Sequence, residues 1–150
     1  MIEFIKDIIA WIFSLIRRAA EFLFAYFLQL GFFNKLLVLT IIPAFFAVIK
    51  PTARYYNFET WFYINNPLAE NLIGIVFLIA VSFFIPPVFA LILRVVPSTA
   101  YFIWVIYLQA SHSVSKAPYE LVFWHYLNML VPLLFVVFSL LSYLKSERGR

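Results

Sequence analysis

Apolar residues occur in long runs along most of the chain, and short polar stretches separate these runs. Four runs from residue 36 onward are almost free of charged side chains, at residues 36–49, 72–93, 98–113 and 119–144. A helix needs about 20 apolar residues to cross the hydrocarbon core of a bilayer, so the run at 36–49 is the shortest candidate. The pattern predicts an all-α membrane protein of one domain, residues 1–150, built on a four-helix transmembrane bundle.

Residues 1–33 follow a different pattern, because their polar side chains recur at helical spacing. Up to residue 21 these polar positions are Glu3, Lys6, Asp7, Ser14, Arg17, Arg18 and Glu21. At 100° per residue they fall within about 120° of arc, and the opposite side of the helix is apolar. An amphipathic helix of this kind lies in the headgroup region or packs against a partner helix. We therefore predict an N-terminal amphipathic interfacial helix that precedes the bundle.

The charged side chains of this helix form the first candidate binding surface. They mix both signs of charge, which suits a protein partner at least as well as an anionic lipid surface. The residues predicted to bind a cytoplasmic partner protein are Glu3, Lys6, Asp7, Arg17, Arg18 and Glu21. The alternative is a solvated helix face whose opposite charges partly neutralise each other.

Prolines and aromatic residues predict how the helices are connected. Pro86 and Pro87 predict a kink in the second span, because each removes a backbone donor and clashes with the preceding turn. Residues 95–98 are predicted to form a tight turn in which Pro97 begins the third span. Residues 50–71 combine polar helix breakers with Tyr and Trp, a mixture typical of the membrane interface.

The distribution of basic residues predicts the orientation of the spans. With the N-terminus inside, the inner side carries eight of them, Lys6, Arg17, Arg18, Lys35, Arg94, Lys145, Arg148 and Arg150, and the outer side carries three, Lys50, Arg54 and Lys116. The positive-inside rule then places both termini in the cytoplasm, as in a multi-pass protein of a bacterial inner membrane. Because these residues are scattered singly, the net charge of +4 does not predict direct nucleic-acid binding.

The amino-acid composition supports the membrane interpretation and excludes several kinds of catalytic and metal site. Apolar residues make up 65% of the chain and charged residues 12%, against about 25% charged residues in soluble domains. The chain has no cysteine, which excludes disulfides, thiolate metal sites and cysteine nucleophiles. It also lacks the G-x-S-x-G, H-E-x-x-H and phosphate-loop motifs. We therefore predict a protein that is not an enzyme, with the lipid bilayer as its first partner and without a cofactor or metal.

Polar residues gather at one level of the predicted third and fourth spans, and they are Gln109, His112, Glu120, His125 and Asn128. The hairpin formed by these spans is expected to bring them together. Two histidines can ligate haem or a metal, but His112 lies near the predicted surface whereas His125 lies about 10 Å below its own helix start. The cluster is therefore interpreted as interhelical hydrogen bonding that fixes the register of the hairpin.

Two functions follow from these patterns, and a third is kept as a weaker alternative. The first is a small non-enzymatic subunit or scaffold that forms a homo-oligomer or joins a larger membrane complex and docks a partner protein. The second is an oligomeric pore or membrane-permeabilising protein, including a phage or phage-defence component, with a conduit lined by Ser82, Gln109, Asn128 and Ser139. The third is a haem or metal protein that uses His112 and His125. Proton-coupled transport is not expected, because the interiors of the predicted spans carry no charged side chain.

Overall fold

The computed structural model describes residues 1–57, 60–113, 119–121 and 123–148, and within these ranges it leaves the side chains of 53–65, 110–121 and 148 undescribed. The helices are α1 (Ile2–Gln29), α2 (Phe32–Leu39), α3 (Ile41–Ile49), α4 (Ala69–Ser82), α5 (Pro87–Ser113) and α6 (Phe123–Arg148). The strands are β1 (Pro51–Asn57), β2 (Thr60–Asn65) and β3 (Tyr119–Leu121). The predicted helical class is confirmed, and the structure adds a small sheet that was not predicted.

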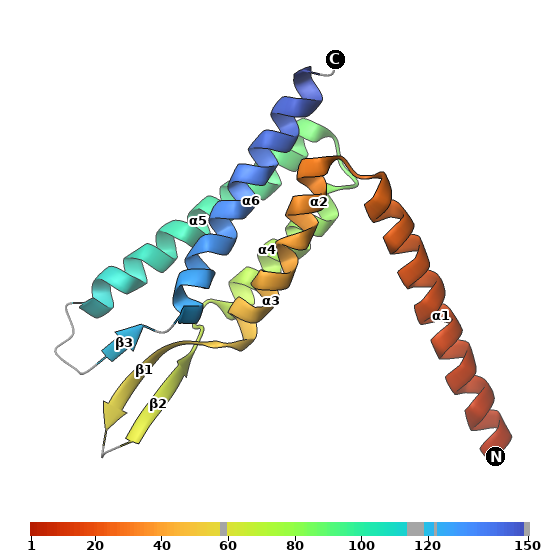
Figure 1. Ribbon diagram of the computed structural model, residues 1–150, viewed down its shortest axis with the longest axis horizontal. Coiled ribbons are helices and arrows are strands. Elements are labelled where there is room, and N and C mark those ends of the chain that lie inside the picture. Colours follow the sequence, from red (N-terminus) through yellow and green to blue (C-terminus); the bar gives the residue numbers. More distant parts are fainter. Residues whose placement is uncertain (58–59, 114–118, 122, 149–150) are drawn as a thin grey trace.

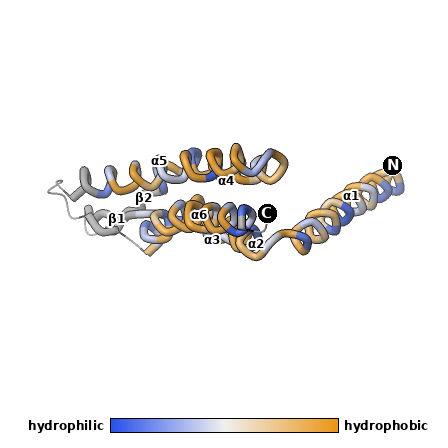
Figure 2. Tube along the Cα trace, turned by 90° about the horizontal axis from the view of Figure 1, so that it is seen from above, coloured by the Kyte–Doolittle hydropathy of each residue, from blue (hydrophilic) through white to orange (hydrophobic). Residues whose placement is uncertain are grey.

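Helices α2 to α6 pack side by side into a bundle of two layers. Figure 2 shows α4 and α5 in one layer and α2, α3 and α6 in the other. Helices α2 and α3 form one rod, because the backbone N–H of Thr40 donates to the carbonyl of Leu36 and its own carbonyl accepts from Ala44. The chain passes along the bundle four times, through α2–α3, α4, α5 and α6 (Figure 1).

Within the described part of the chain, three segments are long and apolar enough to cross a membrane by length and composition, namely Phe32–Ile49, Pro87–Gln109 and Phe123–Glu147. Helix α4 is apolar but shorter, with 14 residues. At 1.5 Å per residue it extends about 21 Å. The structure thus contains four apolar passes, of which three have the length that a complete crossing requires.

The connection between the second and third passes lies at a different place from the predicted one. The turn predicted at residues 95–98 is wrong, because α5 runs without a break from Pro87 to Ser113 with Pro97 in its interior. The chain turns at residues 83–86 instead. Pro87 suits the first turn of α5, where no helical partner exists for its missing N–H, and it disfavours helical backbone at Pro86. The predicted spans at 72–93 and 98–113 are therefore replaced by α4 and α5.

The interior of the bundle is built from small and polar side chains as well as apolar ones. Buried small or polar residues include Ala44, Ala47, Ser82, Ser98, Asn128 and Ser139, whereas Phe45, Phe77, Phe84, Phe89 and Ile103 are exposed. Helices that associate within lipid place small residues at their contacts. Soluble monomers rarely expose contiguous apolar surface of this extent. The bundle therefore has the distribution of residues that a lipid environment favours.

A three-stranded antiparallel sheet of order β2-β1-β3 lies at the end of the bundle opposite the end of α6 (Figure 1). The β1–β2 hairpin occupies the stretch predicted as an interfacial loop, with Arg54 opposite Tyr63 in the register. Glu120 was predicted to begin the fourth span. It lies in β3 instead, opposite Arg54 of β1, and α6 begins at Phe123.

Helix α1 stands apart from the bundle. It leaves at the end where α2 begins and diverges from the other helices along its length (Figure 1). Apolar and hydrophilic colours alternate along it in Figure 2, whereas the bundle helices are mainly apolar. No residue of α1 is buried. The structure therefore contains the predicted N-terminal amphipathic helix, which is exposed over residues 1–25 and half-buried at Tyr26 and Phe27.

Candidate functional site

Two clusters of buried polar side chains lie at opposite ends of the bundle. We call the end with the sheet the sheet end, and the end where α6 finishes and α2 begins the C-terminal end (Figure 1). From the sequence, a polar cluster was predicted at the sheet end only. Most polar members of the C-terminal cluster line one cavity, whereas Tyr101 is the member of the sheet-end network that borders a separate surface cavity.

At the sheet end, the structure brings together some of the predicted cluster and separates others. The ring atom Nε2 of His125 lies 3.3 Å from Oε1 of Gln109, across the contact between α6 and α5. Asn128 does not join this pair, because its Oδ1 accepts hydrogen bonds from Asn66 and Tyr101. The side chains of His112 and Glu120 lie outside the described residues, so their predicted place in the cluster stays a prediction.

The hydrogen bonds of Asn66 show what the sheet-end network does. Its Nδ2 donates to the carbonyl of Ala47 at 3.0 Å and to Oδ1 of Asn128 at 3.1 Å, and its Oδ1 accepts from the N–H of Leu68 at 3.0 Å. One side chain from the β2–α4 connection thus joins α3, α6 and the start of α4. Because both ends of this amide are occupied, the network holds helices in register and leaves little hydrogen-bonding capacity for a ligand.

The described residues hold no group of three His, Asp or Glu side chains that would coordinate a metal ion. The polar residues that would line a pore are also engaged within one chain. Ser82 and Ser139 each donate to a carbonyl of their own helix, and Asn128 belongs to the network described above. The geometry at these positions supports helix packing more than a conduit.

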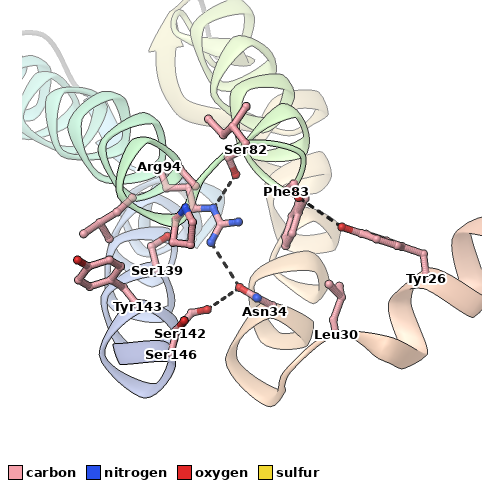
Figure 3. A pocket seen from close by; sticks show the side chains of 14 residues that line it. Tyr26, Leu30, Asn34, Ser82, Phe83, Arg94, Ser139, Ser142, Tyr143 and Ser146 are labelled. Atoms are coloured by element: carbon pink, nitrogen blue, oxygen red, sulfur yellow. Dashed lines mark hydrogen bonds between the residues drawn. The ribbon is translucent and has the colours of Figure 1, made fainter. Parts of the chain in front are cut away.

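The cluster at the C-terminal end is centred on Arg94, in the second turn of α5 (Figure 3). From the sequence, this residue was predicted to follow the last residue of a span, and no charged side chain was expected in any span interior. That expectation is wrong for Arg94, because α5 continues past it and the residue is only 7% exposed. The reason is the displaced turn, which moves the helix boundary from residues 95–98 back to the prolines.

Two neutral oxygens and one aromatic ring surround the guanidinium of Arg94. Its Nε donates to Oγ of Ser82 at 2.6 Å, and its Nη1 donates to Oδ1 of Asn34 at 3.4 Å. Its Cζ lies 4.6 Å from the centre of the Phe83 ring, a cation–π distance. Oδ1 of Asn34 also accepts from Oγ of Ser142 at 2.7 Å, so that α2, α5 and α6 meet at one amide oxygen.

A cavity of about 190 Å³ opens beside Arg94. Helix α6 contributes polar groups at positions i, i+3, i+4 and i+7, which are Ser139, Ser142, Tyr143 and Ser146. These positions share one helix face. Asn34 of α2, Ser82 of α4 and Tyr26 of α1 complete the polar lining (Figure 3). The cavity is therefore lined by a cation and neutral hydrogen-bonding groups, and no carboxylate is among its lining residues.

A second cavity of about 230 Å³ lies next to the first and shares Asn34, Ser142 and Ser146 with it. It adds Lys145, whose Nζ lies 5.8 Å from the centre of the Phe33 ring. It also includes residues 31–33, where α2 begins. Asn34 and Ser142, which share a hydrogen bond, thus line both the Arg94 cavity and the cavity that includes Lys145.

The predicted partner-binding residues of α1 are all exposed, and they are Glu3, Lys6, Asp7, Arg17, Arg18 and Glu21. Nε of Arg17 lies 2.9 Å from Oε1 of Glu21, in an exposed i, i+4 ion pair. Such a pair contributes only about 0.3 to 0.5 kcal/mol. The structure places the six residues on one helix but brings no part of the bundle onto them.

Tyr26 connects α1 to the bundle. Its ring stacks on Phe84 with 6.0 Å between ring centres, and its hydroxyl lies 3.5 Å from the carbonyl of Phe83. Both partners belong to the turn between α4 and α5. Because Tyr26 also lines the Arg94 cavity, the attachment of α1 and the cavity share one wall.

Asn34, Ser82, Arg94 and Ser142 were not predicted from the sequence as members of one site. One signal was present, because Ser139, Ser142, Tyr143 and Ser146 recur at helical spacing in the last turns of the fourth span. The contact of Arg94 with Ser82 could not be found in this way. It depends on a chain reversal at residues 83–86, which the sequence pattern placed elsewhere.

Comparisons of the chain with models of protein families, with curated proteins and with solved structures found no match.

Proposed function

We propose that the protein is a non-enzymatic integral membrane subunit that crosses the bilayer four times and docks a cytoplasmic protein through α1. The exposed apolar side chains on the outside of the bundle support membrane insertion, since soluble proteins rarely expose apolar surface of this extent to water. Because the chain makes four passes, the C-terminal ends of α1 and α6 lie at the same end of the bundle. The excess of basic residues on that side supports a cytoplasmic location for it.

The exposure of α1 over residues 1–25 is the observation that carries the docking role. An amphipathic helix of 28 residues gains most of its stability from covering its apolar face. The bundle covers none of it beyond the contacts of Tyr26. The apolar face is therefore assigned to the lipid headgroup region beside the bundle.

The charged side of α1 is assigned to a protein. Three acidic residues, Glu3, Asp7 and Glu21, balance three basic ones, Lys6, Arg17 and Arg18. A stripe without net charge gains little from anionic lipid, which attracts basic segments. A protein surface with its own mixture of charges can match both signs, and such complementarity selects one partner over others.

Charge reversal tests this assignment. The double variant R17E/R18E is expected to remove the peripheral partner from the complex isolated in mild detergent, since it replaces two basic residues by acidic ones. Membrane insertion and the number of copies of this chain should stay unchanged, because the apolar face is intact. The measurement is the mass of the complex, with K50E at the sheet end as the control for a charge change.

Two results would contradict the docking role of α1. One is a wild-type complex whose mass corresponds to this chain and its lipid alone. The other is a complex whose mass is unchanged in R17E/R18E but falls when the chain is truncated after Lys145, which would place recognition at the end of α6.

A further inference from the structure

We propose that the cavity beside Arg94 binds a phosphate-class oxyanion, either the phosphodiester of an anionic lipid headgroup or a soluble phosphate. The site lies in the bundle and uses none of the six charged residues of α1. It therefore stands independently of the docking role proposed above.

The first observation is a buried cation without a counter-charge. Arg94 is 7% exposed, and none of the carboxylates in the described ranges lies within ion-pair distance of it. Its two hydrogen-bond acceptors, on Ser82 and Asn34, are neutral. A buried charge is normally paired, because transfer from water to an apolar interior is costly. An anion beside the guanidinium would supply the missing charge.

The second observation is unused donor capacity that borders the cavity. A guanidinium has five N–H donors in a planar fork that matches phosphate oxygens in pairs. The bonds to Ser82 and Asn34 use two of them. Tyr143 and Ser146 bring hydroxyl groups to the same wall. The amide of Asn34 accepts two bonds through Oδ1, so its Nδ2 is a further donor.

The third observation is the second cation. Lys145 lines the adjoining cavity, and the two cavities share Asn34, Ser142 and Ser146. The start of α2 borders the same space, where the helix dipole adds a partial positive charge. Lys145 and the start of α2 thus add positive charge beside the cavity that Arg94 lines.

The depth of the site suits a headgroup. Arg94 lies seven residues into α5, which is about 10 Å along the axis. Its partners are Ser82, the last residue of α4, and Asn34, in the first turn of α2. Its guanidinium therefore lies near the level at which α4 ends and α2 begins (Figure 3). The space is also sufficient, because 190 Å³ is more than ten times the roughly 10 to 15 Å³ that one water needs.

Direct binding measurements on the full-length protein test the site and identify the source of the phosphate. In one arm, the protein in non-ionic detergent is mixed with equal amounts of phosphatidylglycerol and phosphatidylcholine, and native mass spectrometry reports which lipid is retained. In the other arm, inorganic phosphate is titrated into the same preparation in a calorimeter. Selective retention of phosphatidylglycerol assigns the site to a headgroup, and binding of phosphate alone assigns it to a soluble ion. Absence of both would overturn the proposal.

Variants place the binding at this cavity. Arg94→Gln is expected to weaken binding by about tenfold or more, because a charge-assisted contact is lost. Lys145→Gln should weaken it several-fold. Lys50→Gln is the matched control. Lys50 lies 5.5 Å from the centre of the Trp124 ring, as Lys145 lies 5.8 Å from that of Phe33, but the two lysines are at opposite ends of the bundle. Lys50→Gln should bind as the wild type does.

The folding of Arg94→Gln has to be measured by circular dichroism and elution volume, because the side chain also joins three helices. If the variant folds and binds normally, Arg94 serves packing alone and the proposal is wrong. If it does not fold, the double variant K145Q/S146A decides, since it leaves the hydrogen bonds of Arg94 in place. If K145Q/S146A and Lys50→Gln then lose binding to the same extent, the proposed site is wrong.

Discussion

A single amide side chain, Asn66, holds the sheet end of the bundle together. It donates to Ala47 and Asn128 and accepts from Leu68, and Tyr101 donates to the same Asn128. Each of these polar atoms is buried, so the loss of one partner leaves another unsatisfied. Such a loss costs more than the hydrogen bond itself contributes.

Asn128→Ala is therefore expected to lower the free energy of unfolding by about 1 to 3 kcal/mol, because Asn66 and Tyr101 lose their shared acceptor. The measurement is unfolding of the purified protein in mixed detergent micelles. Asn71→Ala provides the control, since Asn71 is exposed and lies outside this network. Equal stability of the two variants would show that the network does not hold the helices.

Residues close to each other in a hairpin could be predicted, whereas partners separated by a loop could not. Gln109 and His125 were assigned to one level from their distance to the predicted turn, and they lie 3.3 Å apart. Asn66 is 62 positions from Asn128 and belongs to a stretch interpreted as interfacial. No periodicity relates the two, since their contact depends on how α3 and α6 pack.

At the scale of the element, the position of Pro97 distinguishes two places where the second and third passes could be joined, residues 83–86 and residues 95–98. A proline inside a helix leaves the carbonyl four residues earlier, that of Leu93, without its N–H partner. Pro87 has no such cost, because it lies in the first turn of α5. Sequence pattern alone does not distinguish the two positions, because proline favours a turn and a helix start equally well.

Pro97→Ala is expected to raise the melting temperature, because it restores the hydrogen bond to Leu93 and removes a penalty of up to about 3 kcal/mol. Pro87→Ala should lower it slightly, because it frees the unfolded chain by about 0.4 to 1 kcal/mol. Thermal unfolding of both variants in the same detergent gives the comparison. A lower melting temperature for Pro97→Ala would favour a turn at residues 95–98 and contradict a continuous α5.

The small sheet shows how one pattern supports two interpretations. Residues 51–65 are rich in Tyr, Phe, Trp and Thr, which are frequent in strands as well as at membrane interfaces. The pairing of β1 with both β2 and β3 is what selects the strand. That pairing joins residues from two separate connections, so no local signal contained it.

At the scale of the whole molecule, the helical class and the apolar character of the bundle were predictable although a turn was misplaced. A displaced turn shifts the bounds of two neighbouring helices but leaves the direction of every other pass unchanged. Arg94 also stays at the C-terminal end in either arrangement, so the excess of basic residues on that side is preserved. The long apolar runs therefore determined the architecture better than they determined its boundaries.

Cysteine labelling tests the orientation, since the chain has no cysteine of its own. Asn57→Cys, at the end of β1, is expected to react with an impermeant maleimide added to intact cells. Ser146→Cys, at the C-terminal end, should react only after the membrane is opened, because the proposed orientation puts this end on the cytoplasmic side. Labelling of residue 146 in intact cells would contradict the proposed orientation.

The shortness of α4 makes the perimeter of the inserted protein uneven in height. Its 14 residues cover about 21 Å of a hydrocarbon core near 30 Å, whereas α5 and α6 are long enough to cover it fully. In the proposed four-pass insertion, lipids beside α4 would have to compress, and the elastic cost of this mismatch would be relieved where a neighbouring protein replaces them. The outer surface of α4 would then be the part of the circumference where lateral association gains most from lipid deformation.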